Sequence, residues 1–223
     1  GVWCPCEMQS GSPATLIGIV GASGAGKTTL ARALVAALQE AVVVPMDAYY
    51  RDLSHLDTEA RTHRNFDAPE AFEWPLFVND LQTLRRGGDI KRPSYDFTAH
   101  TRRPETIPVA ARPFVIAEGL FLLCRREVRA LFDVTVFLDV DEPTAINRRV
   151  ARDGRERGRD EVSVRTQYAH QVQPMFVRHV LPTRQWATLT LSGQAPVALG
   201  VESLLAHLKL DHGLFGHRRV PTA

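Results

Sequence analysis

The chain has 223 residues, of which 44% are hydrophobic and 23% are charged. This composition is typical of a globular protein and excludes a disordered or fibrous chain, and the length is sufficient for one α/β domain with a real hydrophobic core. The formal net charge of +2 is too small for the electrostatic attraction that drives sequence-independent binding of nucleic acid, so we expect no such partner. The longest apolar run, residues 114–124, is about half a membrane span, so no membrane partner is expected either.

The two ends of the chain are predicted to lie outside a single domain that covers residues 14–210. Residues 1–13 form the predicted N-terminal tail, and residues 211–223 form the predicted C-terminal tail. The N-terminal segment lacks a basic stretch followed by an apolar one, so no secretory signal is predicted and the expected location is cytoplasmic. The odd number of cysteines, three in all, agrees with a reducing compartment.

Segments with strand and helix patterns alternate along this domain. In chain order, short apolar runs predict strands at residues 15–20, 41–44, 114–117, 134–138 and 188–191. Helical spacing of apolar residues predicts a helix that begins at Thr28, and further helices at residues 75–86, 143–152, 160–180 and 201–210. Buried strands that alternate with helices indicate an α/β fold, in which a parallel five-stranded sheet is flanked by helices and binds ligands at the carboxyl ends of its strands.

Two segments fit neither the strand period nor the helix period. They comprise residues 51–73 and 89–112, and both are rich in charged residues, proline and aromatic residues. We predict that both segments face the substrate, and that the second is a small β-rich insertion in the domain.

The segment between the first strand and the first helix matches the P-loop pattern of glycine, four residues, glycine, lysine and serine or threonine. Its glycines let backbone N–H groups surround phosphate oxygens, and the following helix directs its positive end toward them. Lys27 would reach the terminal phosphates, and the Thr28 hydroxyl can hold Mg²⁺. A glycine turn that binds nothing is disfavoured, because a strand precedes the segment and a helix follows it. The predicted nucleotide-binding residues are Gly21, Ala22, Ser23, Gly24, Ala25, Gly26, Lys27, Thr28 and Thr29.

Carboxylates at the ends of predicted strands are candidates for the chemistry of a bound triphosphate. A metal-bound triphosphate requires an acidic group on a neighbouring strand, and Glu118 and Asp139 both end an apolar run. The residues alone favour neither of the two. Asp47 follows the second strand, where it can act as the base for an acceptor hydroxyl in a kinase, although an ordinary turn aspartate is an equal alternative. The chain lacks the Asn-Lys-x-Asp and Asp-x-x-Gly motifs of signalling GTPases, which argues against that class.

Six arginines fall between Arg148 and Arg159, and we predict that residues 148–160 form a lid. Phosphoryl transfer spreads negative charge over the phosphate oxygens, and guanidinium groups can neutralise this charge while excluding water. The alternative is a solvated helix end, and it remains the better interpretation for Arg148 and Arg155.

Several ordered blocks together resemble the uridine kinase branch of the phosphoribulokinase and uridine kinase family, over residues 14–187. Besides the P-loop and the arginine segment, these blocks are Asp47-Ala48-Tyr49-Tyr50, Asn65 to Phe72, Pro93 to Phe97 with His100, Glu118-Gly119, Gln167-Tyr168 and Leu181-Pro182-Thr183. The resemblance implies a P-loop NTPase fold and transfer of the γ-phosphate of ATP or GTP, with Mg²⁺, to the 5′-hydroxyl of uridine or cytidine. It also implies a homo-oligomeric, tetrameric assembly.

Roles for individual residues follow from the same resemblance. Asp47 is implied to be the general base and to contact the metal, with Glu118 rather than Asp139 as the second metal carboxylate. Asp67 is implied to bind the ribose hydroxyls, helped by Arg159 and Gln167, since a carboxylate accepts two hydroxyl donors well.

The resemblance further implies which residues surround the base and the phosphates. Tyr95 and His100 would recognise the base, with Tyr50 and Phe66 as the aromatic wall of the pocket. Arg149 would lie near the acceptor. The remaining implied catalytic residues, besides Asp47, are Lys27, Arg152 and Arg157.

Two alternatives remain beside a pyrimidine nucleoside kinase. One is another kinase of the same family, acting on ribulose phosphate or pantothenate, and Tyr95 with His100 argues against it. The other is a nucleotide-binding regulator without turnover, which has no need of two carboxylates, Asp47 and Asp67, that face an acceptor. The pair Ala187-Thr188 differs from the Ala-Asp pair of the family, which leaves the preference between ATP and GTP open.

Overall fold

The computed structural model describes residues 13–62 and 64–211 of the chain. The predicted tails at residues 1–13 and 211–223 lie outside the described residues, except for residues 13 and 211. No helix in the described ranges is both long enough and apolar enough to cross a membrane.

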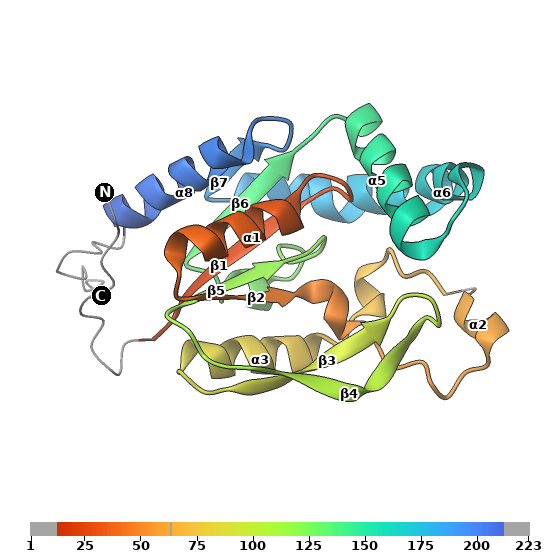
Figure 1. The fold of residues 1–223 in the computed structure, drawn as a ribbon, viewed down its shortest axis with the longest axis horizontal. Coiled ribbons are helices and arrows are strands. Elements are labelled where there is room, and N and C mark those ends of the chain that lie inside the picture. The colour runs from red at the N-terminus through yellow and green to blue at the C-terminus, as the bar shows by residue number, and fades with distance from the viewer. Residues whose placement is uncertain (1–12, 63, 212–223) are drawn as a thin grey trace.

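A five-stranded parallel sheet lies at the centre of the molecule (Figure 1). The strand order is β2-β5-β1-β6-β7, and every neighbouring pair is parallel. The strands are β1 (Thr15–Gly21), β2 (Ala41–Pro45), β5 (Phe114–Glu118), β6 (Val134–Asp139) and β7 (Leu189–Ser192). The three inner strands are buried along almost their whole length, as expected when helices cover both faces of a parallel sheet. The predicted parallel five-stranded sheet is therefore confirmed.

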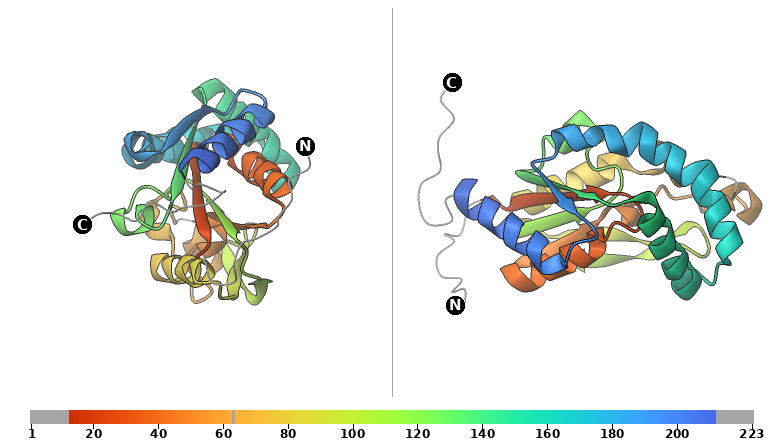
Figure 2. Two further views of the ribbon diagram at one scale, coloured as in Figure 1. Left: turned by 90° about the vertical axis from the view of Figure 1, so that its left-hand side faces the viewer. Right: turned by 90° about the horizontal axis from the view of Figure 1, so that it is seen from above.

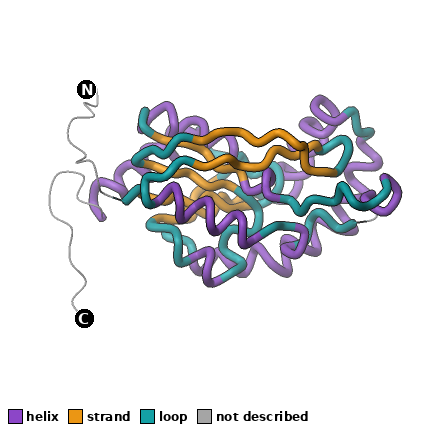
Figure 3. The backbone as a smooth tube through the Cα atoms, turned by 90° about the horizontal axis from the view of Figure 1, so that it is seen from below, coloured by secondary structure: helices purple, strands orange, loops and turns teal. Residues whose placement is uncertain are grey.

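The helices divide the core into two halves, one on each face of the sheet. Alternate residues of β1 point to opposite faces: Ile17 and Ile19 join one half of the core, and Leu16 and Val20 join the other. The first half is covered by α1 (Lys27–Leu38) and α8 (Val197–Asp211), and the second by α3 (Trp74–Arg85). Figures 2 and 3 show the helices arranged around the strands.

The segment at residues 89–112 forms the small β-rich insertion that its composition predicts. Its strands, β3 (Ile90–Asp96) and β4 (Thr101–Val109), pair antiparallel in a hairpin separate from the main sheet. In the other segment, residues 51–73, the described residues form short helical turns, α2 (Thr58–Thr62) and the 3₁₀ turn Pro69–Ala71, and Phe72 forms an isolated β-bridge with Tyr50.

Helical segments follow β6 and curve around the end of the sheet (Figure 2). They are α5 (Glu142–Arg157), α6 (Glu161–Gln167), a π-helical turn at Tyr168–Val172, α7 (Gln173–Met175), a second π turn at Phe176–Val180, and the 3₁₀ turn Leu181–Trp186. The short helix α4 (Arg126–Arg129) lies between β5 and β6. The helix predicted at residues 160–180 is confirmed as helical, but its two π turns have no signal in the periodicity of the sequence.

Two predicted helix boundaries are wrong. The helix predicted to end at residue 152 continues to Arg157 and stops at Gly158, which adopts the left-handed conformation (φ 61°) that favours glycine. Gly154 lies inside this helix, at a cost of about 1 kcal/mol relative to alanine. Helix α8 begins at Val197, four residues before the predicted start, directly after Pro196, a residue type favoured at the first turn of helices.

Candidate active site

The predicted site residues lie at the carboxyl ends of the central strands. The P-loop follows β1, Asp47 follows β2, and Glu118 is the last residue of β5. The strand register pairs Pro45 with Glu118 and Ile19 with Glu118. These three segments therefore meet at one edge of the sheet, as expected for a ligand site in an open parallel sheet.

The P-loop adopts a conformation that depends on its glycines. Gly24 and Gly26 have φ angles of 84° and 98°, which side chains rarely tolerate. A Cβ atom at Gly24 would also overlap the carbonyl oxygen of Ala145 in α5. Helix α1 starts immediately after this loop, at Lys27, so its positive end points into the loop.

Lys27 folds back across the P-loop and is half-buried. Its Nζ donates to the carbonyl oxygens of Gly21 at 3.1 Å and Ala22 at 2.9 Å. Burial lowers the pKa of Lys27, while the nearby carboxylates of Glu118 and Asp47 act in the opposite direction. The lysine therefore lies between the loop and the two carboxylates that were predicted to serve the same nucleotide.

Of the two strand-end carboxylates, only Glu118 bonds through its side chain to the residue that follows the P-loop lysine. The Thr28 hydroxyl donates to Glu118 Oε1 at 3.2 Å, and burial raises the pKa of Glu118 against the effect of Lys27. Asp139 instead forms an ion pair with Arg184 at 3.0 Å, with 44% of the aspartate side chain exposed. The residue pattern favoured neither Glu118 nor Asp139 as the metal carboxylate, and their different side-chain partners now distinguish them.

The donor set suits a divalent ion that arrives with its nucleotide. No group of three or more His, Cys, Asp or Glu residues in the described ranges could hold a metal ion. The Thr28 hydroxyl, Glu118 and Asp47 supply hard oxygen atoms, and Mg²⁺ typically completes its shell with water and substrate phosphates. These residues fit Mg²⁺ bound together with a triphosphate.

Asp47 is exposed at the site and is carried by a firmly anchored turn. This 3₁₀ turn, Met46–Tyr49, follows β2 directly. The fully buried Tyr49 donates a hydrogen bond from its hydroxyl to Asp80 Oδ2 at 2.8 Å. This bond attaches the turn to α3. The sequence contains no signal for this contact, because Tyr49 and Asp80 belong to segments that only the fold brings together.

Aromatic residues from three parts of the chain form one wall beside Asp47. Tyr50 stacks on Phe72, with ring centroids 4.3 Å apart, and lies within 5.1 Å of Tyr95 and 5.7 Å of Phe66. Phe66 in turn stacks on His100 at 4.9 Å. The structure therefore brings together all four residues predicted to surround the base.

Tyr95 and His100 both show features of a binding position. The Tyr95 hydroxyl is buried and has no hydrogen-bond partner among the described residues, a costly arrangement that a ligand can relieve. His100 adopts a φ of 50° in the hairpin turn, which is uncommon for residues other than glycine. Its pKa is lowered, chiefly by burial and further by Arg157 and Arg159.

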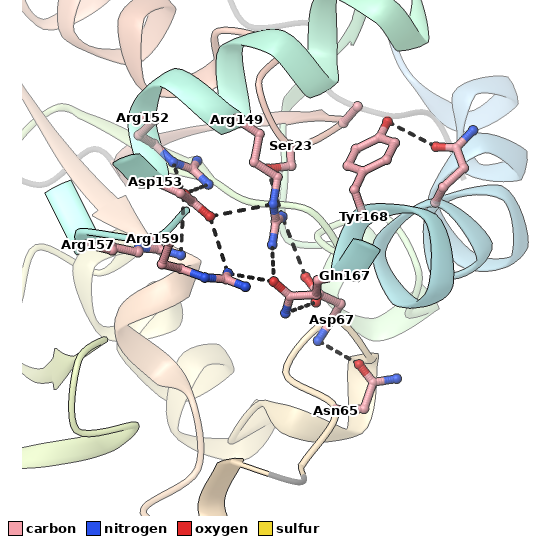
Figure 4. Close-up of polar contacts among 12 residues, drawn as sticks. Ser23, Asn65, Asp67, Arg149, Arg152, Asp153, Arg157, Arg159, Gln167 and Tyr168 are labelled. Carbon is pink, nitrogen blue, oxygen red and sulfur yellow. Dashed lines mark hydrogen bonds and ion pairs between the residues drawn. The ribbon is translucent and has the colours of Figure 1, made fainter. Parts of the chain in front are cut away.

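Asp67 lies near Tyr50 of this wall, in contact with its predicted partner Gln167 and with Arg149 (Figure 4). It is only 9% exposed, and burial raises its pKa against the effect of Arg149. Gln167 donates from Nε2 to Asp67 Oδ2 at 3.5 Å, and Arg149 lies 3.8 Å from Oδ1. The backbone N–H of Asp67 donates to the Asn65 side chain at 2.9 Å.

Arg149 connects this acceptor side to the P-loop. It donates to the Ser23 hydroxyl at 3.1 Å and to Gln167 Oε1 at 3.3 Å. Arg159 donates to the same Gln167 oxygen at 2.6 Å. The Ser23, Arg149, Gln167 and Asp67 side chains therefore form a continuous polar connection, which is visible in Figure 4.

The two arginines predicted to face the phosphates lie in different surroundings. Arg152 influences the pKa of Lys27 and of Glu118, which places it on the P-loop side. Arg157 has its guanidinium 4.9 Å above the ring of Phe97 and influences His100, on the acceptor side. Arg148, interpreted as solvated, is exposed but also donates to the carbonyl oxygens of Gly193 at 2.8 Å and Gly24 at 3.3 Å.

A cavity of about 280 Å³ adjoins the P-loop on the side away from Asp67. It lies between the start of α1 and the turn that joins β7 to α8, and Arg148 forms part of its wall. Its position next to the P-loop suits the base of a bound nucleotide. The sequence pattern missed the contacts of Arg148 with this loop, because nothing in a run of arginines distinguishes one that bonds to a loop.

The fold and this arrangement define the class of the protein as a P-loop nucleotide-binding α/β protein. The sequence matches the Phosphoribulokinase / Uridine kinase family over residues 16–197. A uridine kinase of Brevibacillus brevis is 41% identical over 197 residues, covering 86% of this chain and 92% of that protein. A uridine kinase of Clostridium novyi is 38% identical over 190 residues, covering 83% of this chain and 91% of that protein.

The chain belongs to the phosphoribulokinase/uridine kinase family, and the resemblance inferred from the sequence blocks is confirmed. A solved phosphoribulokinase from Rhodobacter spheroides has the same fold, with a TM-score of 0.59 and 15% identity over 81% of this chain and 70% of that one. The predicted P-loop fold is confirmed with it.

Proposed function

We propose that the protein is a pyrimidine ribonucleoside kinase, which transfers the γ-phosphate of ATP or GTP to the 5′-hydroxyl of uridine or cytidine and yields UMP or CMP. The proposal rests on the family and on one observation above all: a P-loop and an aromatic pocket with a buried carboxylate meet at Asp47. Arg149 spans the junction, through Ser23 on one side and Asp67 on the other.

The donor would bind with its phosphates in the P-loop, held by backbone N–H groups and by the charge of Lys27. Thr28, Glu118 and Asp47 would hold Mg²⁺ together with the phosphates. The ion would neutralise part of the negative charge on the transferred phosphoryl group. The cavity bordered by Arg148 would take the donor base.

The acceptor would bind with its ribose against Asp67 and its base against the aromatic wall. Asp67 accepts hydrogen bonds from the 2′- and 3′-hydroxyls. Gln167 donates to the Asp67 carboxylate and is itself held by a hydrogen bond from Arg159. Asp47 accepts the proton of the 5′-hydroxyl as this oxygen attacks the γ-phosphate. Arg152 and Arg157 stabilise the negative charge that develops on the phosphate oxygens.

Recognition of both pyrimidines follows from the chemistry of His100. Uracil presents N3–H and O4, whereas cytosine presents N3 and an amino group, so a shared site needs a partner that can donate or accept. Neutral imidazole has one nitrogen of each kind and can exchange them by a change of tautomer or a ring flip. The lowered pKa of His100 keeps the ring neutral, and the Tyr95 hydroxyl can rotate to assist.

A panel of nucleosides with ATP or GTP tests the proposal, with the monophosphate product measured by chromatography. We expect turnover of uridine and cytidine and poor turnover of adenosine and guanosine. We expect weaker turnover of 2′-deoxyuridine, because Asp67 loses a partner at a cost of about 1–3 kcal/mol. Phosphorylation of ribulose 5-phosphate or pantothenate instead would indicate another kinase of the family, and nucleotide binding without any turnover would indicate a regulator.

The cytoplasmic location and the tetrameric assembly belong to the same proposal. Free nucleosides and nucleoside triphosphates are the substrates, and both are small molecules. Light scattering of the purified protein tests the assembly, and a molar mass near four times 24.8 kDa would support it.

A further inference from the structure

Asp153 lies outside the predicted set of site residues, yet it is the central anion of the arginine segment. Its side chain is 0% exposed. Four guanidinium groups surround it in what we call the arginine cluster, formed by Asp153 with Arg149, Arg152, Arg157 and Arg159 (Figure 4). The four cations come from the last turns of α5 and from the turn that follows it.

The two oxygens of Asp153 hold different arginines. Oδ1 accepts from Arg152 Nε at 3.0 Å and lies 2.9 Å from Arg152 Nη2, with Arg157 Nη1 at 3.6 Å. Oδ2 lies 3.5 Å from Arg159 Nη1 and 3.7 Å from Arg149 Nε. One carboxylate thus contacts arginines that serve different parts of the proposed site.

These arginines face two substrates. Arg152 lies on the same face of α5 as Arg148 and Arg149, which stand three to four residues before it and donate to Gly24 and Ser23 of the P-loop. Its charge also acts on the pKa of Lys27 and of Glu118. Arg149 and Arg159 both donate to Gln167 Oε1 on the acceptor side, and Arg149 also donates to Ser23 of the P-loop. Asp153 is therefore the shared partner of the donor-side and acceptor-side cations.

A concentration of four like charges requires a compensating anion. Guanidinium groups that approach one another in a partly dry site repel strongly, and a carboxylate between them reduces this repulsion. Asp153 does so without neutralising the cluster, because the four arginines outnumber Asp153 and Asp67, the two carboxylates that they contact. A positive excess remains for the phosphates.

The cluster also contains two buried groups whose hydrogen bonds are incomplete. Asp153 Oδ2 and Arg149 Nε are both buried without a hydrogen-bond partner among the described residues, although they are 3.7 Å apart. An approach of about half an ångström would bring them to hydrogen-bonding distance. The acceptor-side contact is therefore looser than the donor-side contact to Arg152.

We propose that Asp153 is a positioning residue of the kinase, which holds the donor-side Arg152 and the acceptor-side Arg149 and Arg159 in one fixed arrangement. This inference rests on the proposed function. Asp153 touches neither substrate and acts through the arginines, so that the γ-phosphate and the 5′-hydroxyl are presented to each other in a single geometry. Loss of its charge loosens the arrangement of the arginines without removing either binding site, since the contacts of Arg149 with Ser23 and Gln167 do not involve Asp153.

The first test is Asp153→Asn, with Glu156→Gln as the matched control. The asparagine keeps the size of the side chain and the backbone contacts of Asp153, whose carbonyl oxygen accepts from the N–H groups of Gly158 and Arg159. Glu156 lies on the same helix but is exposed. We expect kcat for uridine to fall about 30-fold or more in Asp153→Asn, in the range of losses caused by misplaced catalytic groups, and to stay within about twofold in Glu156→Gln, as for an exposed charge.

Binding measurements separate positioning from a loss of structure. Calorimetry with ADP alone and with uridine alone should give dissociation constants within about threefold of the parent, since the P-loop and the acceptor pocket remain. Uridine should bind the parent more tightly with a non-hydrolysable ATP analogue present, and this gain should disappear in Asp153→Asn. A kcat within threefold of the parent, or an unchanged gain, would overturn the proposal.

A second variant keeps the test decisive if Asp153→Asn does not fold. We expect Asp153→Asn to fold, because Arg152, Arg157 and Arg159 are partly exposed and can turn toward water when the carboxylate charge is removed. Asp153→Ala leaves a space that formate can fill, and formate should restore turnover several-fold where chloride at equal ionic strength does not. If neither variant folds, or if formate has no effect, Asp153 serves the fold and the positioning role is rejected. Failure of the proposed function would appear instead in the parent protein, as an absence of nucleoside turnover.

Discussion

The donor side and the acceptor side of the site are built in different ways. The phosphate-binding part of the donor side is a continuous segment, residues 21–29, whose backbone shape depends on Gly24 and Gly26. The acceptor side consists of side chains from separate segments, among them Asp67, Tyr95 and Gln167. A phosphate group can be held by backbone N–H groups, which every sequence possesses, whereas a nucleoside requires particular side chains in particular places. The acceptor side is therefore where members of one family can differ in substrate.

The arginine segment lies between these two regions and belongs to both. Arg149 contacts Ser23 of the P-loop and Gln167 on the acceptor side. It therefore connects a site formed mainly by backbone N–H groups to a site formed by side chains. Substitutions can test this division, since a change on the donor side should prevent reaction with every acceptor, and a change on the acceptor side should alter the choice among acceptors.

The largest expected effect is that of Lys27→Ala on the donor side. The charge of Lys27 serves the β- and γ-phosphates both in binding and during transfer, so turnover should become undetectable with every nucleoside. Product formation measured by chromatography checks this, with Lys91→Ala as a control, because Lys91 is exposed on β3. Parent-level turnover in Lys27→Ala would refute the assignment of the P-loop as the donor site.

The second effect is that of Asp47→Asn, where the two sides meet. The amide keeps size and polarity but cannot take the proton of the acceptor, so kcat should fall by about 10² or more, the usual scale for loss of a general base. The dissociation constant of uridine, measured by calorimetry, should change by less than about threefold, because Asp67 and the aromatic wall hold the nucleoside. An equal loss of affinity and of rate would instead identify Asp47 as a binding or folding residue.

The third effect compares two arginines of one helix. Arg152→Ala, on the donor side, should lower kcat by about 10² with every acceptor, as for loss of a charge that stabilises the transition state. Arg157→Ala should have a smaller effect on kcat and should also raise KM for uridine, because Arg157 lies over Phe97 beside the base pocket. Melting temperatures should change little, since partly exposed ion pairs contribute about 0–1 kcal/mol. Large losses of melting temperature in both variants would favour a structural role for the segment.

The same division explains how much could be predicted from the sequence. The sheet and the P-loop follow from local patterns, because an apolar run or a glycine spacing has the same meaning wherever it occurs. Asp139 and Glu118 could not be told apart by pattern, since both end buried strands that flank β1, and only their side-chain contacts, Glu118 with Thr28 and Asp139 with Arg184, separate them. Nothing in the sequence distinguishes Asp153 from the other charged residues of the segment 148–160, and its burial depends on four arginines whose positions only the fold defines.

The smallest effect is a dependence of the acceptor affinity on pH through His100. Burial, Arg157 and Arg159 lower the pKa of His100 below its ordinary value of about 6.5, so the neutral ring that recognises both pyrimidines persists as the pH falls toward 6. The affinity for uridine and cytidine should therefore be constant from pH 8 to pH 6.5 and should weaken only below that, as the imidazolium form loses its acceptor nitrogen. Calorimetry with each nucleoside alone measures this without contributions from the phosphate chemistry. In His100→Phe the affinity for both pyrimidines should be weaker at every pH, with ADP binding unchanged, and the weakening below pH 6.5 should be absent. If His100→Phe keeps the parent affinity and the parent pH profile, another residue recognises the base.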